Sequence, residues 1–355
     1  MIVFTYRIPL VYIAGERIFV HYYTHLHGGF VTTAEKADAK NIERAAAILR
    51  SGGIVAFPTE TVYGLGADAF NPVACARIFE AKNRPSFDPL IVHIARAGEL
   101  DILAKTVPKR ARSLIERFWP GPLTLVFDKK DGVPDIVTAG LSTVAVRMPS
   151  HPVALSLIER TGKPIAAPSA NPFGYISPTR AGHVVGQLGD AVDMILDGGE
   201  CAVGLESTII RIEGARAVLL RPGGLALEEI EKIIGEVDDA SGPSRNPRAP
   251  GQTLSHYSPR TPVLIAAGDS VAGRIAGNAG LLAFREHPDA AGFAHVEVLS
   301  PSGDLREAAA RLFSCLHELD SRGLDIIIAE PVPEQGLGRA IMNRLRRAES
   351  AARGH

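Results

Sequence analysis

Apolar and polar positions alternate with helical spacing in the segment after residue 40. The apolar residues stand at positions i, i+3, i+4 and i+7, which places them on one face of a helix. They are Ile42, Ala45, Ala46 and Leu49. The pattern predicts a helix over 41–50 that packs this face on a core and ends at the glycine pair 52–53.

Short apolar runs and further helical patterns alternate along the rest of the chain. Two helices are predicted to begin with a capping residue and a proline, at Asn71-Pro72 and at Ser177-Pro178. Predicted helices cover residues 71–82, 108–118, 152–160, 177–188, 227–234, 304–318 and 340–352. Predicted strands cover residues 54–57, 90–94, 123–127, 144–147, 165–167, 194–196, 208–212, 218–220, 263–266, 281–283 and 326–329. The alternation, with hairpin-like spacing between the later strands, predicts an α/β fold with a mixed sheet.

The composition changes after residue 234. The run 241–251 is rich in proline, glycine and serine, as is typical of a linker. Beyond it, strands alternate with helices, which predicts a small three-layer α/β domain. We therefore expect four parts. They are an N-terminal extension at 1–33, a larger domain at 34–234, a linker at 235–262 and a C-terminal domain at 263–355.

Composition excludes several classes of protein. The chain has 355 residues and a formal net charge of −1, which argues against a surface that coats nucleic acid through charge alone. Its three cysteines are far apart and form no CxxC pair, so neither a disulfide framework nor a cysteine zinc site is favoured. No apolar run reaches membrane-spanning length, and the first residues lack the pattern of a signal peptide. We expect a cytoplasmic protein that does not bind membranes.

Polar residues near the first predicted strands are candidates for ligand binding. The run Phe57–Gly66 offers threonine hydroxyls and glycine-exposed amides, which suit a small polar ligand but equally an ordinary turn. Lys82 and Arg84 stand at a helix end, where cations suit phosphate oxygens and are also favoured by the helix dipole. His93 lies in an apolar run, so it fits either a ligand contact or a satisfied core histidine.

A second group of candidates follows in the later strands. Thr143 and Arg147 fall on one face of a predicted strand, where they suit a carboxylate or phosphate, or else a solvated sheet edge. A loop of small residues leads to Ser177, which either helps to bind an anion or caps its own helix. The run Glu206–Thr208 and the later Arg221 add hydroxyls and a further guanidinium.

Six segments stand in a characteristic order along the chain. They are FPTETVYGLG, AKNRPSFDPLIVHI, STVAVRMPSHP, APSANPFGYISPT, LESTII and LRPGG. In this order the chain resembles the YrdC-like family, in its two-domain threonylcarbamoyl-AMP synthase branch. The resemblance covers about residues 34–230 and continues in 250–251, 255–259 and 336–345.

The resemblance implies a fold and an activity. The fold is a twisted mixed sheet with a concave, positively charged cavity, joined to a smaller Rossmann-like α/β domain. The activity is a nucleotidyl transfer that makes L-threonylcarbamoyl-AMP from L-threonine, bicarbonate and ATP and releases pyrophosphate. Mg²⁺ would accompany ATP, with no metal site of the protein's own.

The resemblance also implies partners. The product would pass to downstream tRNA threonylcarbamoyl-transferase proteins. These form N6-threonylcarbamoyladenosine in tRNAs that read codons beginning with A. Weak tRNA binding is a further implication.

Individual residues take roles from the same resemblance. Two would be catalytic, Lys82 and Arg84. The threonine-binding residues would be Thr61, His93, Thr143, Arg147, Ala167 and Ser207. The ATP-binding residues would be Lys82, Arg84, Asp88, Ser169, Asn171, Ser177, Arg221 and Tyr257. Two positions depart from the family pattern: Asp88 stands where similar sequences often have Asn, and Gln252-Thr-Leu254 replaces a more usual Met-basic-aromatic run.

Three other functions compete with this one. A double-stranded RNA-binding module would use the cavity as a platform, which the near-neutral charge does not favour. A carbamoyl-transfer relative from hydrogenase maturation would carry zinc-finger cysteine pairs and an acylphosphatase-like segment, and this sequence has neither. A regulatory protein that senses nucleotide is the third. Threonine-dependent pyrophosphate release separates the enzyme from all three.

Overall fold

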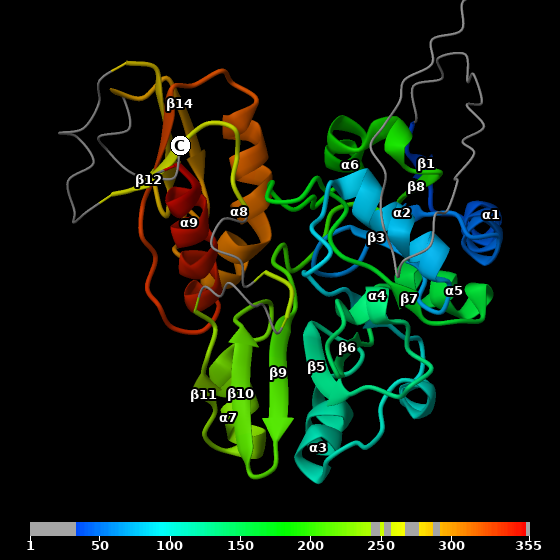
Figure 1. The fold of residues 1–355 in the computed structure, drawn as a ribbon. Coiled ribbons are helices and arrows are strands. Elements are labelled where there is room, and N and C mark those ends of the chain that lie inside the picture. Colours follow the sequence, from blue (N-terminus) through cyan, green and yellow to red (C-terminus); the bar gives the residue numbers. More distant parts are fainter. Residues whose placement is uncertain (1–32, 243–248, 252–256, 267–276, 287–291, 353–355) are drawn as a thin grey trace, which may run out of the picture. The chain divides into compact units, whose positions relative to one another are not determined.

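The computed structural model describes residues 33–242, 249–251, 257–266, 277–286 and 292–352. Nearly all of the predicted N-terminal extension and the sequence departure at 252–254 fall outside these residues. The described residues form two sheets with helices packed against them (Figure 1). This arrangement confirms the predicted mixed α/β fold.

The larger sheet has eleven strands in the order β1-β8-β2-β3-β7-β4-β6-β5-β9-β10-β11. The strands are β1 (Glu35–Lys36), β2 (Val55–Phe57), β3 (Gly64–Asp68), β4 (Ile91–His93), β5 (Leu123–Asp128), β6 (Thr143–Arg147), β7 (Ile165–Ala166), β8 (Met194–Asp197), β9 (Thr208–Glu213), β10 (Arg216–Arg221) and β11 (Asp238–Asp239). Parallel and antiparallel pairs both occur, since β6 runs parallel to β4 and antiparallel to β5. The strand β11 pairs with β10, so this sheet extends past residue 234.

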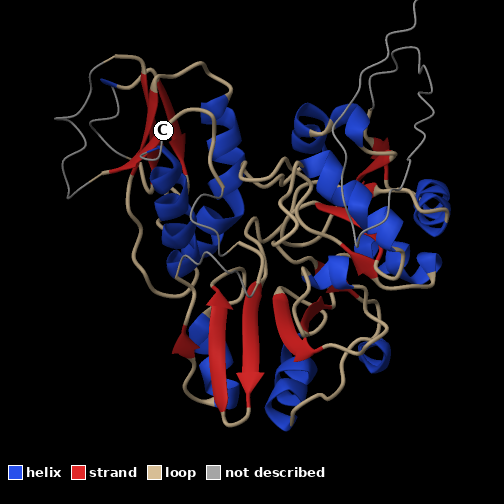
Figure 2. Cartoon of the chain, in the orientation of Figure 1, coloured by secondary structure: helices blue, strands red, loops and turns tan. Residues whose placement is uncertain are grey.

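Helices cover both faces of the first strands (Figure 2). The helices that pack on the large sheet as a whole are α1 (Ala39–Arg50), α2 (Pro72–Lys82), α3 (Lys109–Phe118), α4 (Asp135–Thr138), α5 (Pro152–Thr161), α6 (Ala181–Gln187) and α7 (Leu227–Ile234). Short 3-10 helices lie at Ala97–Ile102 and Gly189–Ala191. The apolar face predicted for α1 is buried, and Asp38 caps this helix by accepting from the amide of Asn41. Asn71 caps α2 in the same way, with Pro72 in the first turn. Both predicted helices are therefore confirmed.

The later strands of the large sheet differ on their two faces. On one face, the apolar side chains of β5, β6, β9 and β10 join those of α3 and α7 in the main core. On the other face lies a small separate cluster that includes Ile91, Ala145, Ile209 and the linker residue Ala249. This cluster contains no residue of a described helix. The second face of the sheet can therefore line a site.

The smaller sheet has four parallel strands in the order β12-β15-β13-β14. They are β12 (Val263–Ile265), β13 (Ala279–Ala283), β14 (His295–Val298) and β15 (Ile326–Ala329), and the helices are α8 (Leu305–Asp320) and α9 (Gly338–Ala352). Apolar residues of α8 and α9 share one cluster with one face of the strands. The segments after β12 and β13 are partly outside the described residues, so the third layer stays a prediction.

The loop before β9 packs against the C-terminal part of the chain. Gly204, with φ +70°, lies so close to α8 that an added Cβ would be 2.4 Å from the carbonyl oxygen of Ala310. Nearby, the rings of His183 on α6 and His317 on α8 stack with centroids 3.8 Å apart. These contacts join α8 to the part of the chain that carries the large sheet.

Two local predictions were wrong. No strand was predicted at 64–68, and the run 57–66 was expected to bind a ligand or form an ordinary turn, but Gly64–Asp68 forms β3 against β2. At Gly66 a Cβ would lie 2.8 Å from the ring of Phe57, so this pairing needs a residue without a side chain. The second error is the helix start at Ser177: α6 begins at Ala181. The Ser177 hydroxyl donates instead to Glu206, a partner distant in sequence.

No helix in the described part of the chain is long and apolar enough to cross a membrane.

Candidate functional site

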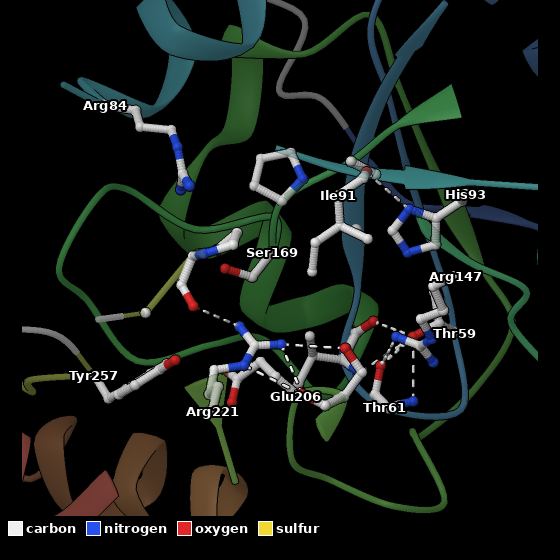
Figure 3. Close-up of a pocket in the computed structure, with 17 residues that line it drawn as sticks. Thr59, Thr61, Arg84, Ile91, His93, Arg147, Ser169, Glu206, Arg221 and Tyr257 are labelled. Carbon is white, nitrogen blue, oxygen red and sulfur yellow. Dashed lines mark hydrogen bonds between the residues drawn. The ribbon is translucent and has the colours of Figure 1, made fainter. Parts of the chain in front are cut away.

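A small pocket lies where several strands of the large sheet end (Figure 3). Its cavity measures about 50 Å³. The lining residues are Thr59, Thr61, Val62, Gly64, Arg84, Ile91, His93, Arg147, Ala167, Pro168, Ser169, Glu206, Ser207, Arg221, Pro250, Gly251 and Tyr257. Many of them are polar side chains that are nevertheless buried. Such groups must be paired or serve a ligand, because burial of unpaired polar groups is costly.

Strand register brings the pocket residues together. His93 and Arg147 are direct neighbours at the ends of the parallel strands β4 and β6. Arg147 in turn pairs with Thr124 of β5, which lies beside the start of β9. Side chains that are dozens of residues apart in sequence therefore meet at one edge.

Arg147 is held by the loop after β2. Its Nη1 donates to Oγ1 of Thr61 at 2.7 Å, and its Nη2 forms an ion pair with Oε1 of Glu60 at 2.6 Å. The hydroxyls of Thr61 and Thr59 lie 2.8 Å apart and share a hydrogen bond. The guanidinium is thus fixed in orientation while its side chain borders the pocket. Sequence reasoning did not select Glu60, whose role depends on a partner in a distant strand.

His93 is neutral in this site. Burial, together with the nearby positive charge of Arg147, lowers the pKa of His93 to about 3. Its Nδ1 lies 3.2 Å from the carbonyl oxygen of Ile91, and its ring meets Phe57 edge to face. A neutral imidazole can accept or donate a hydrogen bond to a ligand without adding charge.

Arg84 reaches the pocket from the turn after α2. It donates to the carbonyl oxygens of Asp88 at 3.0 Å and Pro89 at 2.7 Å. Its Nη2 also forms an ion pair with Oδ2 of Asp88 at 2.9 Å, and both side chains are almost completely buried. Asp88 does not line the pocket. It orients Arg84, which is a different role from the direct ATP contact that the resemblance implies.

Arg221, at the end of β10, lines the pocket on the side away from His93 and Arg147 (Figure 3). Its Nε and Nη2 donate to the carbonyl oxygen of Ser207 at 3.1 and 2.9 Å, and Nη2 lies 3.1 Å from the Ser207 hydroxyl. Its Nη1 donates to the linker carbonyl of Pro250 at 3.3 Å. Among the described residues, Arg221 has no carboxylate within ion-pair distance. It therefore carries the least compensated charge among the arginines that line the pocket.

Among the described residues, Glu206 is the one carboxylate in the pocket lining. Arg344 of α9 donates from Nε to its Oε2 at 2.9 Å, and Ser177 donates to its Oε1. The guanidinium of Arg344 also lies 4.7 Å from the ring centroid of Tyr257. Tyr257 itself stacks on Phe313 of α8. No local sequence pattern indicates the Glu206–Arg344 pair, because 138 positions separate the two residues.

Lys82 and Asn171 belong to the supporting structure of the neighbouring loop. The Lys82 ammonium is buried, which lowers its pKa well below the ordinary value. It donates to the carbonyl oxygens of Ser169 (2.6 Å) and Asn171. The Asn171 amide donates to Pro172 and Tyr175 within the same loop. Lys82 therefore fixes the position of Ser169, which does line the pocket.

The structure brings together most of the residues selected from the sequence. Those that line the pocket are Thr61, Arg84, His93, Arg147, Ala167, Ser169, Ser207, Arg221 and Tyr257. Those outside its lining are Lys82, Asp88, Thr143, Asn171 and Ser177. Thr143 lies at the far end of β6, paired with Asp128 rather than with residues at the pocket edge. The pocket thus combines guanidinium groups, hydroxyls and a neutral histidine, which suits ligands with carboxylate or phosphate groups.

Comparison with known proteins identifies the family. Residues 47–223 match the Sua5–YciO–YrdC family model, described as "Telomere recombination". Residues 225–350 match the model of the threonylcarbamoyl-AMP synthase C-terminal domain. The threonylcarbamoyl-AMP synthase of Pyrococcus abyssi is 47% identical over 330 residues, which span 90% of this chain and 96% of the relative. The chain belongs to the threonylcarbamoyl-AMP synthase family.

Other members of the threonylcarbamoyl-AMP synthase family agree with this assignment. The Bacillus subtilis enzyme is 44% identical over 333 residues, covering 90% of this chain and 95% of its own. The crystal structure of P. abyssi Sua5 complexed with L-threonine matches with a TM-score of 0.85 at 44% identity, covering 91% of this chain and 98% of that one. The match covers 91% of this chain, so the Pyrococcus structure shares its two-part fold.

Proposed function

We propose that this protein synthesises L-threonylcarbamoyl-AMP from L-threonine, bicarbonate and ATP. The observation that supports this most directly is the convergence of Arg84, Arg147 and Arg221 on one pocket. They come from three different elements and lie beside hydroxyls and a neutral histidine. The reaction joins two anionic reactants, so a site with several fixed cations is what its chemistry requires.

Threonine occupies the side of the pocket formed by the loop after β2 and the end of β6. Arg147, held in place by Thr61 and Glu60, supplies the positive charge for the threonine carboxylate, and Thr61 and Ser207 offer hydroxyls for the polar groups of the amino acid. His93 adds no positive charge next to the amine, because its low pKa keeps the ring neutral at physiological pH. This favours the uncharged amine that must react with bicarbonate.

ATP occupies the side formed by Arg84, Ser169 and Arg221. The two guanidinium groups suit phosphate oxygens because their planar donor forks match that geometry. Lys82 contributes through the loop that carries Ser169, whose carbonyl it binds. Its position in the structure supports a positioning role rather than the direct catalytic contact implied by the resemblance.

The reaction needs no enzyme nucleophile. The threonine amine and bicarbonate form a carbamate with loss of water, and a carbamate oxygen then attacks the α-phosphorus of ATP. The bond from the α-phosphorus to the bridging oxygen breaks, and pyrophosphate leaves with that electron pair. The protein supplies alignment of the two reactants and cations facing the charge that develops.

Mg²⁺ would enter with ATP rather than occupy a site of the protein's own. Among the described residues, no group of three or more His, Cys, Asp or Glu side chains is placed to hold a metal ion. Glu206, the carboxylate of the pocket lining, is engaged by Arg344 and Ser177. Mg²⁺ commonly binds through substrate phosphates and waters with few protein ligands, so the residues present suit an ion carried by the nucleotide.

The described linker residues Pro250, Gly251 and Tyr257 line the side of the pocket that we assign to the nucleotide. Pro250 accepts from Arg221, and Tyr257 closes the lining on the same side. A cavity of about 50 Å³ is far smaller than the several hundred Å³ typical of sites for ligands of this size. We therefore expect the linker to move when ATP binds and to cover the labile adenylate afterwards.

The product would be used in the cytoplasm. It would pass to tRNA threonylcarbamoyl-transferase proteins, which transfer the threonylcarbamoyl group to an adenosine of tRNA. Weak tRNA binding by this chain is part of the same proposal.

Incubation of the purified protein with L-threonine, bicarbonate and Mg·ATP tests the proposal directly. Mass spectrometry should detect threonylcarbamoyl-AMP, and pyrophosphate release should require threonine and bicarbonate together. The Arg84→Ala variant should lose most of this activity, about a hundredfold by analogy with the loss of one charge-stabilising donor. Pyrophosphate release that is independent of threonine would disprove the proposal.

A further inference from the structure

The charged residues around the pocket form a set of defined ion pairs. Arg84 pairs with Asp88, and Arg147 pairs with Glu60. Arg221 donates only to backbone carbonyls and a hydroxyl among the described residues. It is therefore the pocket guanidinium with most charge left for an anionic ligand.

Glu206 is the carboxylate that could compete with an anionic ligand for Arg221. It precedes Ser207, whose carbonyl already binds the Arg221 guanidinium. The two charges interact: Arg221 contributes to lowering the pKa of Glu206, while burial lowers the pKa of Arg221 and the charge of Glu206 partly opposes that change. An ionised Glu206 that was free to turn would neutralise Arg221 and occupy the place of a phosphate.

Arg344 prevents this. Its Nε holds Oε2 of Glu206 at 2.9 Å, while Ser177 holds the other carboxylate oxygen. Although burial by itself raises the pKa of Glu206, Arg344, Arg221 and Ser177 together outweigh it, so the pKa lies below the ordinary value. Glu206 is thus kept ionised and turned toward α9.

The arrangement is not one that stability alone would select. The side chain of Arg344 is completely buried, and its Nη2 has no hydrogen-bond partner among the described residues. Buried ion pairs with unsatisfied donors contribute little net stability, and apolar replacements are often as stable. A functional reason for the pair is therefore needed.

We infer that Arg344 of the C-terminal helix α9 is a positioning residue of the anion pocket, which keeps Glu206 away from Arg221 so that Arg221 can bind a phosphate of the nucleotide. The C-terminal domain thereby contributes to the active site through the charge of Arg344. The inference rests on the proposed function in that the anion is taken to be ATP.

Isothermal titration calorimetry with Mg·ATP tests this role in the full-length protein. Arg344→Met keeps the length of the side chain and removes its charge. The variant should bind Mg·ATP at least about tenfold more weakly, because the released Glu206 carboxylate would compete with the phosphate for Arg221; tenfold corresponds to about 1.4 kcal/mol. Arg346→Met is the matched control, because Arg346 lies on the same helix but pairs with Glu334 at the surface. It should bind like the wild type.

A double variant separates this role from a merely structural one. In Arg344→Met/Glu206→Gln the competing carboxylate is gone, while the glutamine can still accept from Ser177. Mg·ATP affinity should return to within about threefold of the wild type. A structural role for Arg344 predicts no such rescue, so a double variant as weak as the single one would overturn the inference. Wild-type affinity in Arg344→Met would overturn it as well.

Two further measurements keep the test independent of folding and of the proposed function. If Arg344→Met does not fold, Arg344→Lys retains the charge and should bind Mg·ATP within about threefold of the wild type; a tenfold loss would contradict the inference. Inorganic pyrophosphate, used as a second probe, should give the same order of affinities among the variants. If the wild type binds pyrophosphate but makes no adenylate, the proposed function fails while this inference still stands.

Discussion

Asp88 offers a prediction in which stability and ligand affinity change in opposite directions. Its carboxylate and the guanidinium of Arg84 form a buried ion pair at 2.9 Å. Burial raises the pKa of Asp88, although Arg84 and Lys82 oppose the rise. The perturbation is Asp88→Asn, which removes the charge and leaves an amide oxygen that can still accept from Arg84.

The magnitude follows from what the substitution changes. The substitution replaces a hydrogen bond between two charged groups by one in which only Arg84 is charged. Since hydrogen bonds to charged groups contribute about 1.5–3 kcal/mol in total, we expect the loss of one of the two charges to cost roughly 1–2 kcal/mol of unfolding free energy. This corresponds to a Tm lower by about 2–8 °C in the absence of ligand. Arg84 stays in place, because it also donates to the backbone carbonyls of Asp88 and Pro89.

The affinity for ATP should rise. In the variant, a phosphate becomes the only full negative charge that Arg84 meets, so the 1–2 kcal/mol lost in the free protein is recovered in the complex. This amounts to at most about five- to thirtyfold tighter binding of Mg·ATP. Thermal unfolding with and without Mg·ATP, together with calorimetric titration, measures both effects.

Asp131→Asn is the control, because the Asp131 side chain is 95% exposed. It should change neither Tm nor ATP affinity. Unchanged or weaker ATP binding by a folded Asp88→Asn variant would refute the argument, since it would mean that Asp88 does not compete with phosphate for Arg84.

Three other experiments, two of them with a control variant, test separate parts of the structure. Thr61→Ala should raise the KM for threonine about tenfold or more, because it removes a hydroxyl bound to a charged group. The control Thr143→Ala, at the far end of β6, should change this KM less than about twofold. Equal effects of the two substitutions would place the threonine site elsewhere. Gly204→Ala should lower the free energy of urea unfolding by about 2–4 kcal/mol, because the new methyl group collides with the backbone of α8. Gly214→Ala, at a similar φ with nothing within 4 Å, should cost only about 1 kcal/mol. His93 is neutral when folded, with a pKa of about 3, whereas the unfolded chain takes up a proton below its ordinary value of 6.5. The contribution of His93 to stability is thus complete above pH 6.5 and is lost as the pH falls. His93→Gln should therefore reduce the slope of unfolding free energy against pH below 6.5 by up to about 1.4 kcal/mol per pH unit. An unchanged slope would show that His93 is not buried as a neutral ring.

The sequence by itself determined the elements whose signals are local. The apolar stripe and caps of α1 and α2 lie within a dozen residues, so periodicity and capping chemistry were enough to predict them. The resemblance carried by the ordered segments selected most of the polar residues that line the pocket, although it also selected Lys82, Asp88, Thr143, Asn171 and Ser177, which lie outside the lining. Thr61, His93 and Arg147 were found in this way.

Only the tertiary structure decided features that depend on distant partners. The strand β3 exists because its glycines allow close pairing with β2 and contact with Phe57, which local propensity cannot show. Lys82 faces loop carbonyls rather than the cavity, and Ser177 binds Glu206 rather than capping a helix. For Lys82 and Ser177, the local preference was outweighed because a buried polar group needed a partner. That partner is determined by the fold and not by the neighbouring sequence.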